Sequence, residues 1–343
     1  MVMNILFSGI GGPTPLGLAR SVKIAFPEFR LVGVDGSSWS ANLYNSEIFD
    51  ATYQIVSGRA PNYWEVIAEV VAKEAIDFAF IVPETEVLVW SKRQEEGNLP
   101  CKALIPDLQL ASFCFDKLKV ADVLHPLGLS PKTTPFVSNF INDDSSLPIP
   151  YPFWIRVKSG AGALGALKID GQKDLTTWLS LHNHRTDFII SEYLPGRNYA
   201  CKLLFLQGEL IQHASAERID YLLSAAAPSG ISGMCARGKL LNRPDLVEKS
   251  VAALTEISKI LEVDLNGMFT VDFKENTAGE PLITEINIRH VSFNLAFALG
   301  GVNFAETTLR HGLNVTPEMP RSNTFEKESF FIRGVDAPLR LIP

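Results

Sequence analysis

The sequence predicts a protein of α/β class in its N-terminal third and of α+β class in the remainder. Between residues 4 and 105, short apolar strands alternate with helical patterns, which is typical of an open, mostly parallel sheet. Two β-hairpins are expected later, at 199–214 and 268–289, and hairpins belong to antiparallel sheets. The 343 residues suffice for two or three domains with a substantial core.

The N-terminal third is expected to consist of βα units. A strand at 4–8 leads through a turn rich in glycine and proline into a helix that ends near residue 25. The remaining elements of this part are strands at 31–35, 78–82 and 102–105 and helices near 62–74 and 84–95.

The glycine-rich turn and the acid that ends the second strand, Asp35, raise the question of a dinucleotide site. The spacing argues against it. A Gly-x-Gly-x-x-Gly pattern that starts at Gly9 requires glycine at position 14, where the chain has Thr14. Pro13 and Pro15 also lack the amide hydrogens that would hold a phosphate.

Two acids, Glu84 and Glu86, follow the strand at 78–82. They lie at the carboxyl end of the predicted sheet, where parallel sheets hold ligands. The dipole of the next helix also favours acids in its first turn, and this structural role is the preferred interpretation. A ligand contact remains the alternative.

The middle of the chain begins with an expected crossing at 107–113. A helix at 115–125 follows, and Asp116 and Lys117 stand near its start. Residues 139–150 are rich in Asn, Asp, Ser and Pro, which indicates a loop or hinge.

A strand at 153–157 carries Arg156 and leads to Lys158 and the small-residue loop 159–165. Basic residues beside such a loop suit an anionic ligand, because backbone amides can approach it closely. The loop is not a Walker A motif, since no Gly-Lys-Ser/Thr follows. A plain hairpin turn is the alternative.

The last part of the chain mixes strands and helices around one long irregular stretch. Residues 217–240 are rich in Gly, Ser and Ala and carry Arg218, so we expect a mobile binding loop. The expected elements are a strand at 187–191, hairpin arms at 199–206 and 209–214, a helix at 244–261, helices at 293–299 and 304–313, and a closing strand within 325–334.

The hairpin at 268–289 has one apolar and one polar face in each arm, with the turn at 276–279. Asp272 is expected within diagonal reach of Glu285 and Asn287. Two carboxylates and an amide form an all-oxygen site that suits Mg²⁺. A polar face turned to water is the alternative. The apolar faces comprise Phe269, Val271 and Phe273 in the first arm and Leu282, Ile286 and Ile288 in the second.

Composition excludes several classes of function. The net charge of −7 and the lack of a basic run argue against nucleic acid as a partner. No apolar run approaches the ~18 residues that cross a bilayer, and the N-terminus lacks the features of a signal peptide. Four widely spaced cysteines predict neither zinc nor disulfides, so we expect reduced thiols and a cytoplasmic enzyme or binding protein.

The order of these motifs resembles the ATP-grasp superfamily, in particular its carbamoyl phosphate synthetase and biotin carboxylase-like branch. Five stretches carry the resemblance, in chain order: Asp116-Lys117, Arg156, the loop 159–165, Glu192-Tyr193-Leu194, and Asp272 with Glu285-Ile286-Asn287-Ile288-Arg289. The resemblance spans nearly the whole chain and implies a two-lobed grasp fold after a βα domain. It implies a βα domain at 1–112, a linker and first part of the grasp at 113–150, a small lobe with a flap at 151–195, and a large lobe at 196–343.

The resemblance also implies a role for each matched residue, with ATP and Mg²⁺ as cofactors and Mn²⁺ as a possible substitute. The implied metal ligands are Asp272, Glu285 and Asn287, and the implied catalytic residue is Arg289. Arg218, on the stretch 217–240, is expected as a second catalytic residue that contacts an acyl phosphate. The implied nucleotide contacts are Lys117, Arg156, Lys158, Gly160, Gly162, Glu192, Tyr193, Leu194 and Asn198.

Two positions depart from the family's pattern. Asn198 stands where an acid usually contacts the ribose, although an amide still hydrogen-bonds a hydroxyl. Ile288 replaces the signature proline, which alters only the backbone. Four residues lie near these motifs, and taken alone each is expected to have a structural or solvent-facing role: Lys202, His213, Arg218 and His290.

The implied function is a ligase that activates a small-molecule carboxylate as an acyl phosphate for attack by an amine, in the manner of an amino-acid or peptide ligase. Its expected partners are these two substrates, with no nucleic acid or membrane, and a homodimer is an open possibility. One alternative is an enzyme that makes carbamoyl phosphate or activates bicarbonate. Another is a nucleotide-binding regulatory protein without turnover, suggested by Asn198.

Overall fold

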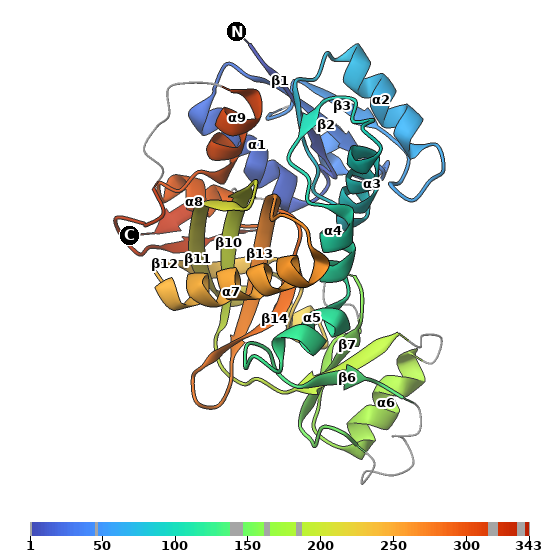
Figure 1. Ribbon diagram of the computed structural model, residues 1–343, viewed down its shortest axis with the longest axis vertical. Coiled ribbons are helices and arrows are strands. Elements are labelled where there is room, and N and C mark those ends of the chain that lie inside the picture. Colours follow the sequence, from blue (N-terminus) through green and yellow to red (C-terminus); the bar gives the residue numbers. More distant parts are fainter. Residues whose placement is uncertain are drawn as a thin grey trace.

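The computed structural model describes most of the chain, namely residues 2–44, 47–137, 147–160, 165–182, 187–314, 322–334 and 340–342. These residues form sheets of five, seven and four strands. Figure 1 shows the five-stranded sheet at the top, the seven-stranded sheet in the middle and the four-stranded sheet in a lobe at the bottom. None of the helices in these ranges is long and apolar enough to cross a bilayer.

The N-terminal sheet is parallel, as the alternation of strands and helices predicts. Its order is β3-β2-β1-β4-β5, so the order of strands reverses beside β1. The strands are β1 (Asn4–Ser8), β2 (Arg30–Asp35), β3 (Ala51–Gln54), β4 (Phe78–Phe80) and β5 (Lys102–Ala103). The helices are α1 (Pro13–Ala25), α2 (Tyr63–Lys73) and α3 (Glu84–Glu95), with a short 3-10 helix, η1 (Ala41–Leu43).

The glycine-rich turn after β1 is held by Asp35. Its carboxylate accepts hydrogen bonds from the amides of Gly11 at 2.6 Å and Ser37 at 2.8 Å. Gly9 has a φ of +68°, and a Cβ there would lie 2.6 Å from Pro83. Asp35 therefore stabilises the turn, in agreement with the argument against a dinucleotide site.

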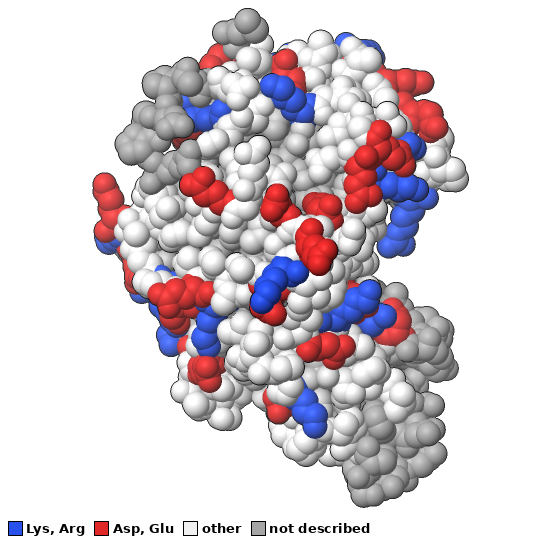
Figure 2. All heavy atoms as spheres, in the orientation of Figure 1, with Lys and Arg blue, Asp and Glu red and all other residues white. Residues whose placement is uncertain are grey.

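The small lobe is built on an antiparallel sheet of order β6-β9-β7-β8. Helix α6 (Gln172–His182) covers it, with Trp178 packed edge-on against Phe188 at 4.3 Å between ring centroids. Figure 2 shows that this lobe is set off from the rest of the molecule by an indentation. The strands are β6 (Thr133–Pro135), β7 (Phe153–Val157), β8 (Leu167–Ile169) and β9 (Phe188–Glu192).

The seven-stranded sheet has the order β14-β13-β10-β11-β12-β15-β16 and is antiparallel throughout. Helix α7 (Pro244–Leu261) lies against one face of it (Figure 1). Its strands are β10 (Asn198–Leu206), β11 (Glu209–Tyr221), β12 (Cys235–Leu241), β13 (Gly267–Glu275), β14 (Pro281–Asn287), β15 (Phe330–Ile332) and β16 (Arg340–Ile342). The other helices of this part are η4 (Ser224–Ala226), α8 (Asn294–Leu299) and α9 (Phe304–Leu313).

The expected loop at 217–240 is largely a pair of strands. Strand β11 continues to Tyr221 and β12 begins at Cys235, so the irregular part is 222–234. The prediction was wrong because composition alone was used, whereas backbone pairing of Glu217 with Lys239 and Arg218 with Gly238 extends the ladder. A Cβ at Gly238 would lie 2.3 Å from Phe331, so close packing requires glycine there.

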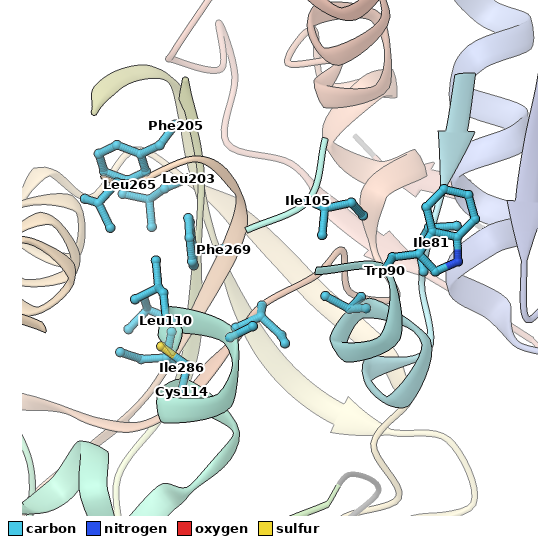
Figure 3. Packing of buried hydrophobic residues seen from close by; sticks show 14 of the residues in the cluster. Ile81, Trp90, Ile105, Leu110, Cys114, Leu203, Phe205, Leu265, Phe269 and Ile286 are labelled. Carbon is cyan, nitrogen blue, oxygen red and sulfur yellow. The ribbon is translucent and has the colours of Figure 1, made fainter. Parts of the chain in front are cut away.

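The expected crossing at 107–113 is a helix, α4 (Leu108–Phe115), followed by α5 (Lys117–Leu124). Asp116 separates them, because its extended backbone ends α4 while its carboxylate caps α5. Helix α4 packs against α3, α7 and β14 and leaves Gln109 and Ser112 exposed. Figure 3 shows Leu110 and Cys114 beside Phe269 of β13 in the same buried cluster that contains Trp90 of α3.

The hairpin of β13 and β14 contains a bulge that sequence periodicity did not locate. The register shifts between Asp272 and Phe273, so Asp272 faces Glu285 while Phe273 faces Ile283. Thr284 is the extra residue. The expectation that Leu282 lies on the apolar face was therefore wrong, because the bulge puts the buried Ile283 there instead.

We predict that Asp107→Ala destabilises the protein by about 1 kcal/mol, because this carboxylate caps α4 by accepting from the amides of Gln109 and Leu110. Urea unfolding followed by circular dichroism measures the change. Asp122→Ala, an exposed position within α5, is the control and should change stability by less than about 0.5 kcal/mol. Equal effects of the two substitutions would contradict a capping role.

Candidate functional site

A cavity of about 390 Å³ lies between the start of α1, the small lobe and the seven-stranded sheet. Thr14 of α1 contributes from the N-terminal part, Arg156 of β7 from the small lobe and Asp272 of β13 from the large sheet. Lys117, at the first position of α5, also lines it. The cavity therefore collects polar side chains from segments that are far apart in the sequence.

The face of the large sheet opposite α7 supplies rows of side chains that follow from the strand register. Arg218, Asn198 and Lys274 form one row across β11, β10 and β13. Asp272 and Glu285 belong to the next row, where they stand directly opposite each other. Because paired residues of an antiparallel sheet share a face, both rows point to the same side.

Three oxygen-bearing side chains converge at the end of the hairpin. Asp272 and Glu285 form a cross-strand pair, and Asn287 donates from Nδ2 to Asp272 Oδ2 at 3.3 Å. Burial raises the pKa of Asp272, and the neighbouring guanidinium of Arg218 opposes this. No group of three His, Cys, Asp or Glu that could hold a metal occurs among the described residues, since the third donor here is an amide.

Two cations approach Glu285 from the opposite wall. Lys117 Nζ lies 3.6 Å from Glu285 Oε1 and donates to the carbonyl of Gly160 at 2.6 Å. Arg156 lies 3.6 Å from Glu285 Oε2 and donates to the carbonyl of Thr284, the bulge residue, at 2.6 Å. Arg156 Nε is buried and has no hydrogen-bond partner in the described part of the chain. It is a donor available for an anion.

The remaining expected nucleotide contacts differ in their surroundings. Tyr193 and Leu194 line the cavity, as does Glu192, whose carboxylate accepts from the amide of Lys132 at 2.9 Å. Lys158 instead pairs with Asp116 at 3.2 Å, and its side chain is 41% exposed. Lys158 is absent from the cavity lining, and Gly162 lies outside the described residues.

Asn198 lines the cavity beside a lysine that sequence reasoning overlooked. Lys274 Nζ lies 3.4 Å from Asn198 Oδ1 and donates to the carbonyl of Gly196 at 2.9 Å. The position of Lys274 on the polar face of β13, two residues after Asp272, was a usable signal. The ammonium group of Lys274 therefore lies beside Asn198, the position at which the resemblance leads us to expect an acid.

The two expected catalytic arginines are both held by acids. Arg218 donates to Asp272 at 2.6 Å; burial lowers its pKa, but the Asp272 carboxylate raises it further, so the net shift is upward. Arg289 lies 3.3 Å from Glu84 at the start of α3. Burial raises the pKa of Glu84, and Arg289 opposes this. Glu84 thus reaches the site, while it also occupies the first turn of its helix.

Tyr221, Ile231 and Met234 also line the cavity, and they belong to the stretch 217–240 that was expected to bind a ligand. Pro13, at the start of α1, lines the cavity too and was not expected, because its sequence context carries no motif for it. His213, for which a structural or solvent-facing role was expected, is half-buried. Its backbone amide donates to Asn323 Oδ1 at 3.0 Å, which is a structural contact.

Comparison with known proteins gives a consistent picture of the fold. No family model and no curated protein matches the sequence. Solved structures do match: the N5-carboxyaminoimidazole synthetase of Staphylococcus aureus complexed with ADP has a TM-score of 0.71 and 15% identity, with 97% of this chain and 83% of that chain covered. The biotin carboxylase–β-γ-ATP complex of Campylobacter jejuni has a TM-score of 0.68 and 14% identity, with coverages of 97% and 76%.

A third similar structure is the L-amino acid ligase of Bacillus licheniformis, with a TM-score of 0.67, 14% identity, and 96% and 79% of the two chains covered. These proteins share the ATP-grasp architecture. The chain therefore has the ATP-grasp fold, preceded by an open parallel βα sheet, as the motif order implies. At this identity the likeness establishes the fold, and the chemistry depends on the site.

We predict a pH-dependent effect of Glu86→Gln. Glu86 is buried and accepts from the Tyr63 hydroxyl at 2.9 Å, and burial raises its pKa from 4.5 to about 7. Between these values the folded chain keeps a proton that the unfolded chain releases, so stability falls as the pH rises through this window.

The glutamine variant stays neutral and escapes this loss. Its stability relative to the wild type should rise by up to roughly 3 kcal/mol between pH 4.5 and pH 7.5, measured by urea unfolding. The exposed Glu69→Gln is the control and should show no such trend. A difference that does not change with pH would contradict a raised pKa of Glu86.

Proposed function

We propose that this protein is an ATP- and magnesium-dependent ligase that activates a small-molecule carboxylate as an acyl phosphate for attack by an amine. One observation carries the proposal: Asp272, Glu285 and Asn287 converge on one side of a cavity, and Lys117 and Arg156 approach from the other. An acidic cation site facing buried cations is the arrangement that phosphoryl transfer requires.

The residues present fit a nucleotide. The unpartnered Nε of buried Arg156 needs an anionic acceptor, and Lys117 and Gly160 stand beside it. Tyr193 and Leu194, directly after β9, offer an apolar surface and backbone groups for a base. The similar structures from S. aureus and C. jejuni hold ADP and an ATP analogue, respectively. We assign phosphate contacts to Lys117, Arg156, Lys158, Gly160 and Gly162, and adenosine contacts to Glu192, Tyr193, Leu194 and Asn198.

The donor set also fits magnesium. Carboxylate and amide oxygens of Asp272, Glu285 and Asn287 are hard ligands, and Mn²⁺ accepts the same donors. When bound, the ion neutralises charge on the phosphates. The three side chains orient it because they lie on adjacent strands of a rigid hairpin.

In the proposed reaction a carboxylate oxygen of the substrate attacks the γ-phosphorus of ATP, the bond to the bridging oxygen breaks, and ADP leaves. The amine then attacks the acyl carbon, phosphate departs, and the nitrogen loses a proton. We assign Arg289 to the substrate carboxylate and Arg218 to the acyl phosphate, since planar guanidinium groups bind such oxygens in pairs. Both arginines are already held beside the cavity, Arg218 by Asp272 and Arg289 by Glu84.

A second enzymatic candidate is activation of bicarbonate, with carbamoyl phosphate as one product class. It is favoured by a similar structure, a biotin carboxylase domain from Hydrogenobacter thermophilus complexed with MgADP and bicarbonate, at 14% identity. A regulatory protein without turnover is the third candidate, because Asn198 replaces an acid.

The four free thiols support a reducing compartment such as the cytoplasm. For the assembly we infer a homodimer.

A screen of carboxylates and amines for ADP release separates these functions. The purified protein with MgATP is offered pairs of amino acids and other small acids and amines, with bicarbonate as a separate arm, and products are identified by mass spectrometry. A coupled amide product supports the ligase. ADP release with bicarbonate alone supports the second candidate. Binding of MgATP without ADP release from any pair supports the regulator and contradicts the ligase.

We predict that Glu285→Gln lowers the rate of Mg-dependent ADP release at least about a hundredfold, because the substitution removes a metal ligand and the negative charge opposite Lys117. Steady-state ADP formation measures the loss. Glu280→Gln is a matched control, since Glu280 precedes the same strand, is exposed, and pairs with Lys249 at 3.0 Å away from the cavity lining. Equal activity of Glu285→Gln and Glu280→Gln would refute the metal assignment.

A further inference from the structure

A buried polar cluster lies next to the proposed site without a role in it. Lys202 of β10 is 0% exposed, and its Nζ contacts His290 Nδ1 at 2.7 Å and Asn294 Oδ1. His290 and Asn294 are buried as well, with their Nδ1 and Oδ1 atoms 3.2 Å apart. Phe304 packs under the lysine, with Nζ 4.7 Å from the centroid of its ring.

Lys202 has no carboxylate partner among the residues that the structure describes. Burial lowers its pKa well below the ordinary value, and burial also lowers the pKa of His290, with Lys202 adding to the effect. The Lys202 amine donates to Asn294 Oδ1, while Asn294 Nδ2 donates to the carbonyl of Val291. The cluster is therefore a hydrogen-bonded tie between β10 and the segment after Arg289.

The tie lies where the chain leaves the hairpin. Arg289 is followed by a short segment, 290–293, that crosses the site face of the sheet before α8 begins at Asn294. The segment is held at its start, because Thr270 Oγ1 donates to the carbonyl of Arg289 at 3.2 Å. Arg289 itself donates from Nη1 to the carbonyl of His290 at 3.0 Å. The carbonyl of His290 and the carboxylate of Glu84 therefore direct this guanidinium together.

Small side chains allow this segment to lie close to the sheet. Ala200, Ala214 and Ala216 belong to one buried cluster with Val291 and Phe293. Lys202 lies on the same sheet face, two residues beyond Ala200 on β10. Apolar packing thus covers the middle of the segment, while Lys202 bonds to both of its ends.

We propose that Lys202 is a positioning residue, which fixes the segment from Arg289 to Asn294 on the sheet and so directs Arg289 toward the carboxylate substrate. The role assigned to Arg289 rests on the proposed function, whereas the tie itself does not. An apolar side chain at position 202 fills the same space but leaves the buried side chains of His290 and Asn294 without their partner. The position of Arg289 then becomes variable while the nucleotide contacts stay in place.

The test compares two substitutions of similar size in the full-length protein. Lys202→Met keeps the volume and removes the donor, whereas Lys202→Gln keeps a donor. Leu203→Ala is the control, because Leu203 belongs to the apolar cluster of the opposite sheet face and its truncation lowers global stability only. Asn294→Leu removes the hydrogen-bond partner of Lys202 and replaces the Lys202 variants in the test if these fold poorly.

The first measurement is hydrogen exchange of peptides covering 289–294 and 267–275. We expect Lys202→Met to accelerate exchange at 289–294 by roughly tenfold to a hundredfold without a change at 267–275, and Asn294→Leu to act alike. Lys202→Gln should restore part of the protection. Uniform acceleration in both peptides, as expected for Leu203→Ala, or no change in either, overturns the proposal.

The second measurement distinguishes an effect on nucleotide binding from an effect on carboxylate binding. MgADP affinity, measured by calorimetry, should stay within about twofold of the wild type in Lys202→Met, since no nucleotide contact is altered. With the substrate pair from the screen, KM for the carboxylate should rise at least about tenfold. A parallel loss of MgADP affinity overturns the proposal. If no pair is turned over, the ligase function fails, and the exchange data still decide the role of Lys202.

Discussion

The structure depends on how two carboxylates on adjacent strands are compensated. Asp272 and Glu285 stand opposite each other, and like charges in this position destabilise a sheet. Arg218 compensates the first within the sheet, while Lys117 and Arg156 reach the second from other parts of the chain. The same contacts join the small lobe to the large sheet. Removing the acids would therefore affect both cation binding and the relative placement of the lobes.

The large sheet packs apolar residues on both faces, but only one face carries the side chains of the site. On one face Phe269 and Leu203 join α4 and α7 in an apolar cluster that continues into the N-terminal part (Figure 3). On the other face the register aligns charged and amide side chains in rows that end at the cavity. Because successive residues of a strand alternate between faces, one short segment such as 269–273 serves both purposes.

Particular elements show where sequence reasoning succeeded and where it failed. Strand 153–157 and helix 84–95 were predicted with the observed bounds, since their patterns are uninterrupted and their ends carry turn or cap residues. Helix α4 was missed because it is only 8 residues long and its exposed side shows just Gln109 and Ser112, which is too short a pattern to define a helical period. The bulge at Thr284 was missed because one inserted residue only blurs an alternating pattern.

The sequence by itself determined the order of the motifs, the apolar and polar faces of β13, and the residue types that suit a cation and an anion. These are local properties, set by spacing along one chain segment. Only the tertiary structure decided that Glu84 meets Arg289, that Lys274 stands beside Asn198, and that Lys202 lies under the segment after Arg289. Each contact joins residues far apart in sequence or depends on strand register, and neither is encoded in local periodicity.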